Sequence, residues 1–130
     1  MRSTLRNRER IMQLNDAAKA VVQRLESDNP DYQFDPAIIL VIVEAIQTLL
    51  PLLIELCEVL PSEVPRAAAK IKAGETFADR VRWRVAYRRL RRELGSDFYS
   101  AGGAKLVDAM LDAAASTSGD RIDELWCSMR

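Results

Sequence analysis

The stretch from Ala37 to Leu60 constrains the fold of this chain more than any other. Eighteen of its twenty-four residues are apolar. The exceptions are Glu44, Gln47, Thr48, Pro51, Glu55 and Glu58. Most of them recur at spacings of four and three, so on a helix they form one narrow polar stripe. A helix that is apolar on nearly all other sides is buried on nearly all sides. The sequence therefore predicts a long, nearly fully buried central helix over 37–60.

The start of this helix is well specified, and its middle carries a proline. Asp35 is a good N-cap and Pro36 suits the first helical position. Pro51 falls on the polar stripe, where water can replace the lost backbone bond and the helix can bend. We expect the central helix to bend near Pro51.

The same stretch is long enough to cross a bilayer, so a membrane-associated helical protein is another interpretation. Three glutamates within the stretch, and acidic rather than basic flanking residues, count against a membrane span. We expect burial in a core or a subunit interface instead.

The remaining pattern predicts an all-α fold, a compact bundle of about five to six helices in a single domain over residues 1–130. Its parts are an amphipathic N-terminal helix (1–27), the central helix (36–60), a short helix followed by an arginine-rich helix (66–94) and C-terminal helices (101–130). In the first of these, Ile11, Leu14, Ala18, Val21 and Leu25 form a seam for one partner helix. No strand pattern and no internal repeat are present.

The arginine-rich helix has an unusual sequence. Thr76 and Asp79 give it a start that resembles a capping box, and Gly95 ends it. We expect its first half to face the core through Phe77, Val81 and Val85. A second apolar face consists of Trp83, Tyr87, Leu90 and Leu94.

Seven arginines lie between these apolar positions, and they are the strongest functional signal in the chain. They are Arg80, Arg82, Arg84, Arg88, Arg89, Arg91 and Arg92. Arginine suits bidentate pairing with carboxylate or phosphate, and Trp83 and Tyr87 could pack or stack on a ligand. The sequence leaves both partners open: acidic protein surface, within the chain or in a neighbouring copy, and nucleic acid.

The net charge of zero conceals a strong segregation of charge. Residues 1–25 carry a net charge of +4, residues 26–65 carry −8, residues 66–92 carry +8 and residues 93–130 carry −4. Opposed blocks of this kind favour complementary contacts within the fold or between copies. Zero net charge argues against a dedicated nucleic-acid binder.

The C-terminal helix has a compact apolar face formed by Ile122, Leu125, Trp126 and Met129. This layout is typical of a helix that docks in a groove. The face could dock on its own bundle or, exchanged between copies, assemble an oligomer.

The residue inventory offers little for catalysis. The chain has no histidine, which removes the commonest general base and transition-metal ligand. No phosphate loop, zinc spacing or nucleophile elbow is present, and Cys57 and Cys127 are isolated, so we expect free thiols. Glu44, Glu55 and Glu58 are better explained as the soluble stripe of the central helix than as a carboxylate site. We predict no catalytic, metal-binding or cofactor-binding residues and no cofactor.

These observations lead to one main hypothesis and one alternative. The main hypothesis is a non-catalytic structural subunit of an oligomer or larger complex, such as a phage or virus particle. Its partners would be copies of itself or another protein with an acidic surface. The alternative is a small nucleic-acid-binding regulator that uses the arginine-rich helix at 80–92. Because the N-terminal arginines are not followed directly by an apolar segment, we expect a cytoplasmic or virion protein rather than a secreted one.

Overall fold

The computed structural model describes residues 2–32 and 34–130, with side chains from Arg8 onwards. Within these residues the regular structure is entirely helical, which confirms the all-α prediction, although there are seven α-helices rather than five to six. They are α1 (Arg2–Asp28), α2 (Pro36–Cys57), α3 (Val64–Ala73), α4 (Phe77–Leu94), α5 (Ser96–Ser100), α6 (Ala104–Ala115) and α7 (Gly119–Met129), with a 3-10 helix η1 at Pro61–Glu63. The short helix α5 was not predicted, because five residues are too few to show a helical period.

Helix α2 begins as the sequence predicts and ends earlier. Asp35 accepts a 2.9 Å hydrogen bond from the backbone N–H of Ala37, and Pro36 occupies the first helical position. The helix ends at Cys57 because Glu58 adopts a left-handed backbone with a φ of 52°. It continues through Pro51, and a bend at this residue stays a prediction.

The burial of α2 is one-sided, so the prediction of nearly complete burial is wrong. Within the most apolar eighteen-residue window of this helix, 39% is buried. Leu40 is 72% exposed because it lies on the register of the polar stripe, four residues before Glu44. Among the described residues, α2 is the one helix that is long and apolar enough to cross a membrane, a test that the core helix of a soluble protein also passes.

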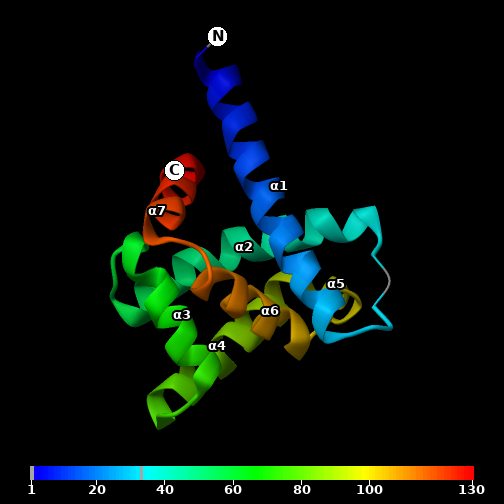
Figure 1. Ribbon diagram of the computed structural model, residues 1–130, viewed down its shortest axis with the longest axis vertical. Helices are drawn as coiled ribbons and strands as arrows, with labels where there is room; N and C mark the ends of the chain where they lie inside the picture. Colours follow the sequence, from blue (N-terminus) through cyan, green and yellow to red (C-terminus); the bar gives the residue numbers. More distant parts are fainter. Residues whose placement is uncertain (1, 33) are drawn as a thin grey trace.

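The helices point towards two ends of the molecule (Figure 1). Helix α2 crosses its middle, where it packs against α1 and α4, and α6 packs against α1 and α3. Helices α1 and α7 extend towards one end, whereas the corner between α3 and α4 forms the other end. The largest fully buried side chain of the core is Phe98 of α5.

An ionic cluster joins three of these helices. Asp112 of α6 pairs with Arg24 of α1 and lies 3.0 Å from Lys72 of α3. The hydrogen bond from Lys72, followed by the bond and charge of Arg24, holds the pKa of Asp112 below its ordinary value. This cluster fixes α1 and α3 on the surface of α6.

The seam of α1 is shorter than the sequence predicts. Leu14, Ala18, Val21 and Leu25 are buried, but Ile11 is 58% exposed. Helix α1 extends past the other helices at its N-terminal end (Figure 1), so the seam continues there without a partner helix among the described residues.

Candidate functional site

Helix α4 is held by the capping residues that the sequence predicts. The hydroxyl of Thr76 accepts a 3.1 Å hydrogen bond from the backbone N–H of Asp79 and donates a 2.8 Å bond to its carboxylate. The Asp79 carboxylate also pairs with Arg82 at 3.3 Å. These bonds satisfy backbone and side-chain groups of the first turn and fix where α4 begins.

Four of the seven arginines form one exposed stripe, which we call the arginine face. Arg80, Arg84, Arg88 and Arg91 recur at spacings of four, four and three. All four are exposed, and none pairs with an acidic side chain among the residues described. Arg92 is exposed one turn beyond Arg88 at the edge of this stripe, Arg89 is exposed on another side of α4, and Arg82 is half-buried. The acidic segment 26–65 therefore does not neutralise this face within the described part of the chain.

Two arginines of the arginine face make other contacts, but no carboxylate among the described residues neutralises their charge. Arg80 donates a 3.1 Å hydrogen bond to the backbone carbonyl of Gly74. The guanidinium of Arg91 lies 5.9 Å from the centre of the Tyr87 ring, within reach of a cation–π contact. Neither contact involves a carboxylate.

The aromatic residues among the arginines point inward. Trp83 is half-buried and stacks on Tyr87 with a ring-centre distance of 5.6 Å. Tyr87 in turn meets the buried Phe98 edge to face at 5.0 Å. The prediction that Trp83, Tyr87, Leu90 and Leu94 face neighbouring helices is confirmed, since Leu90 and Leu94 are buried and both aromatics pack on the core.

The prediction that the first half of α4 faces the core through Phe77, Val81 and Val85 is wrong. Phe77 is 75% exposed and Val81 is 40% exposed, although Val85 packs partly on the core. Trp83, Ala86 and Leu90 occupy the side of α4 that meets its neighbours, and Phe77 and Val81 lie well away from that side on the helix. The consequence is a surface on which an aromatic and an aliphatic side chain lie beside Arg80 and Arg84.

The C-terminal face docks on its own molecule. Ile122 is buried, and Leu125, Trp126 and Met129 are half-buried against the core. Ser118 caps this helix by accepting a 3.2 Å hydrogen bond from the backbone N–H of Arg121. Of the two arrangements that the sequence allowed, the structure has the intramolecular one.

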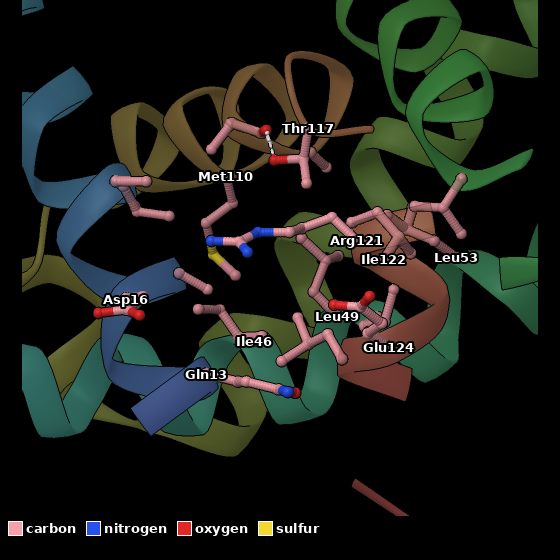
Figure 2. Close-up of a pocket in the computed structure, with 18 residues that line it drawn as sticks. Gln13, Asp16, Ile46, Leu49, Leu53, Met110, Thr117, Arg121, Ile122 and Glu124 are labelled. Carbon is pink, nitrogen blue, oxygen red and sulfur yellow. Dashed lines mark hydrogen bonds between the residues drawn. The ribbon is translucent and has the colours of Figure 1, made fainter. Parts of the chain in front are cut away.

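A cavity of about 260 Å³ separates α1 and α7, with α2 and α6 forming its floor (Figure 2). We call it the α1–α7 cavity. Its lining is mainly aliphatic and includes Ile46, Leu49 and Met110. Figure 2 shows the side chain of Arg121 extending across the cavity to the neighbourhood of Met110. The cavity is lined by side chains from α1, α2, α3, α6 and α7 and by Thr117 of the connection between α6 and α7.

The polar residues that line the α1–α7 cavity lie on α1, on α7 and, for Thr117, in the connection between α6 and α7. Asp16 and Glu124 are exposed acidic residues that line it, and Gln13 lines it from α1. The side-chain oxygen of Gln13 is buried and accepts no hydrogen bond from the residues described. A buried acceptor without a donor is unfavourable, so this position would gain from a donor brought by a ligand.

The sequence alone did not reveal this cavity. Its walls include Ala17 and Ala20 of α1 and Ala113 and Ala114 of α6. Small residues at such spacings were a visible signal, but they indicate close helix packing as readily as a cavity. The gap depends on where α7 docks, which only the tertiary structure settles.

The other candidate groups remain separate. Glu44, Glu55 and Glu58 are exposed, and no cluster of three or more possible metal ligands occurs among the residues that the structure describes. Cys57 and Cys127 are free thiols, as predicted, and burial raises the pKa of the Cys57 thiol.

Comparison with protein-family models, with curated proteins and with solved structures finds no match to this chain. Its function therefore has to be inferred from its own surfaces.

Proposed function

We propose that this chain is a non-catalytic, all-α subunit of an oligomer or larger assembly. In this proposal the arginine face of α4 binds carboxylates on a protein partner. The arginine face carries the proposal, because its four guanidinium groups are exposed and pair with no described carboxylate of the chain. Free guanidinium groups in a row pair well with carboxylates, which accept two parallel N–H bonds each.

The apolar residues beside the arginine face support a protein partner. Phe77 and Val81 are exposed next to Arg80 and Arg84. Protein interfaces are enriched in aromatic residues and arginine, and such residues supply much of their binding energy. A particle of a phage or virus is one assembly that would use a subunit of this kind.

Binding of nucleic acid by the same arginines is the alternative. The exposed charge of the arginine face suits phosphates as well as carboxylates. However, the stacking positions that the sequence offered are occupied, because Trp83 and Tyr87 stack on each other and Tyr87 meets Phe98 edge to face. This arrangement favours protein carboxylates over bases as the partner.

The test is charge reversal on the arginine face. The combined variant Arg84→Glu, Arg88→Glu and Arg91→Glu is compared with the unchanged protein by light scattering behind a sizing column. We expect an oligomer free of nucleic acid for the unchanged protein, dissociation in high salt and a monomer for the triple variant. The control is Arg66→Glu with Arg89→Glu, which changes two exposed arginines outside the arginine face.

A monomer that elutes with nucleic acid, and loses it in the triple variant, would contradict the proposal and support the alternative. The absorbance ratio at 260 and 280 nm, recorded during the same run, separates these outcomes. A triple variant with unchanged mass would exclude the arginine face from the subunit contact.

A further inference from the structure

The first turn of α4 carries an aromatic side chain with no place in the core. Phe77 is 75% exposed, and Val81 follows one turn later on the same side. Arg80 and Arg84 flank them, so we define these four residues as the α4 patch. The patch begins at the corner between α3 and α4, which lies at one end of the molecule (Figure 1). An exposed aromatic residue among arginines at a protruding corner suits insertion into a partner.

The α1–α7 cavity has the size and chemistry to receive this residue. An apolar cavity of about 150 Å³ is known to hold benzene, and this cavity measures about 260 Å³ with a mainly aliphatic lining. The ring of a phenylalanine therefore fits in it. Burial of an aromatic side chain is among the largest apolar contributions to an interface.

The charges around the two surfaces are complementary. Asp16 and Glu124 are exposed residues of the cavity lining, whereas Arg80 and Arg84 flank Phe77. Arg121 also lines the cavity, so its side chain has to move aside when Phe77 enters, and the acidic residues outnumber it there. Helix α7 adds Asp120 and Asp123, both exposed. Opposite charges at matching surfaces fix the orientation of a complex and speed its formation.

The unpaired oxygen of Gln13 supplies a second point of fit. This buried atom belongs to a residue of the cavity lining and lacks a donor among the described residues. A guanidinium group has five N–H donors and no acceptor. An arginine of the α4 patch that reaches the cavity mouth can provide the missing hydrogen bond.

We infer that the α4 patch of one copy inserts into the α1–α7 cavity of a second copy, with Phe77 as the anchor. This inference rests on the proposed function and names its partner and surface. The patch and the cavity belong to different helices, and α1 and α7 extend towards the end opposite the α3–α4 corner (Figure 1). One copy can therefore donate its patch and accept another at the same time. Such head-to-tail contacts form rings when the rotation closes and filaments when it does not.

Mixing two variants tests this geometry, because each lacks one half of the contact. Phe77→Ser removes the anchor, and Ala20→Trp places a large side chain at an exposed position of the cavity wall. Each variant alone should remain monomeric, with the Kd for self-association raised about 30-fold or more. Mixed together, they should form a complex of two copies, because the Trp-bearing copy supplies Phe77 and the serine-bearing copy supplies an open cavity. Light scattering behind a sizing column measures the mass.

Two controls keep the result interpretable. Leu60→Ser changes an equally exposed apolar residue outside both surfaces and should leave the oligomer intact. Circular dichroism checks that each variant stays helical. If Ala20→Trp does not fold, the exposed pair Asp16→Arg and Glu124→Arg replaces it as the cavity variant.

The outcomes separate this inference from the proposed function. An oligomeric unchanged protein whose two variants also oligomerise singly, or fail to combine, would overturn the head-to-tail contact and leave the proposed function standing. The same result would indicate that a different protein occupies the cavity. An unchanged protein that is monomeric at every concentration would overturn the contact between copies, and the proposed function would then require a different protein as the partner of the arginine face.

Discussion

The indole nitrogen of Trp83 donates a 2.8 Å hydrogen bond to the carboxylate of Asp108, which ties α4 to α6. The Trp83 ring also stacks on Tyr87, whose edge meets Phe98. An aromatic residue that the sequence offered as a contact for bases therefore holds the arginine-rich helix in place. The bond sets which side of α4 faces solvent, and so which arginines form the arginine face.

Replacing Trp83 by phenylalanine should weaken this attachment while keeping most of the stacking. The Trp83→Phe variant loses one hydrogen bond to a charged group and leaves the half-buried Asp108 to be hydrated. We expect the free energy of unfolding to fall by about 1–2 kcal/mol. Urea titration followed by circular dichroism measures the change.

The matched control is Trp126→Phe. Trp126 is also half-buried, and its indole nitrogen donates no hydrogen bond among the residues described. A loss of stability as large as that of Trp83→Phe would assign the effect to ring size rather than to the bond.

The ionic cluster at Asp112 should make the protein less stable in acid. Lys72 and Arg24 lower the pKa of the Asp112 carboxyl, so the folded state favours its ionised form. This contribution is present above the ordinary pKa of an aspartate, about 4, and is lost as the pH falls through and below that value. Asp112→Asn should therefore lower the free energy of unfolding by about 1 kcal/mol at pH 7, with little difference from the unchanged protein near pH 2.

Chemical denaturation at a series of pH values tests this prediction. Asp123→Asn removes an exposed carboxylate of α7 that takes part in none of the described ion pairs, and it serves as the control. A difference between the unchanged protein and Asp112→Asn that persists below pH 2 would show that packing, rather than charge, causes the effect.

The helices themselves could be predicted because their signals are local. Asp35, Thr76 and Ser118 each accept a hydrogen bond at a helix start, and the left-handed Gly74 ends α3 as predicted. The polar stripe of α2 was also visible, since Glu44 and Glu55 are exposed. Capping and periodicity depend on residues within a few positions of one another, and the sequence displays those directly.

The surfaces could not be predicted because they depend on distant residues. Helix α4 has apolar residues on two sides, and spacing alone could not show that Trp83 would face inward and Phe77 outward. Asp112 and Arg24 are 88 positions apart. The α1–α7 cavity exists because α7 docks beside α1, and no short stretch of sequence specifies that distance.

Gly119 should be essential for the docking of α7. A Cβ atom added at this position would lie 2.4 Å from the carbonyl oxygen of Ser62 in η1, closer than real contacts allow. Gly119→Ala must therefore push α7 away from η1, and we expect a loss of about 1–3 kcal/mol in the free energy of unfolding. The half-buried Trp126 should become more exposed, which its fluorescence reports.

Ser116→Ala is the control for this prediction, because Ser116 is exposed and lies in the same connection between α6 and α7. It should leave both stability and fluorescence nearly unchanged. Normal stability in Gly119→Ala would mean that α7 can dock without its close contact with Ser62.

Pro51 should destabilise α2, and its replacement should strengthen the helix. A proline inside a helix removes one backbone hydrogen bond and costs about 3 kcal/mol relative to alanine. It also restricts the unfolded chain, which returns about 1 kcal/mol or less. Because Pro51 lies on the polar stripe, where it is half-buried rather than part of the buried core, Pro51→Ala should raise the free energy of unfolding by about 2 kcal/mol with little disturbance of the core. Urea titration measures the change.

Thr48→Ala is the control, because Thr48 lies on the same stripe. Its hydroxyl donates a 3.1 Å hydrogen bond only to the Glu44 carbonyl. A fall in stability on replacing Pro51 would contradict this reasoning, because it would show that the buried Leu52 and Leu53 pack well only on a bent helix.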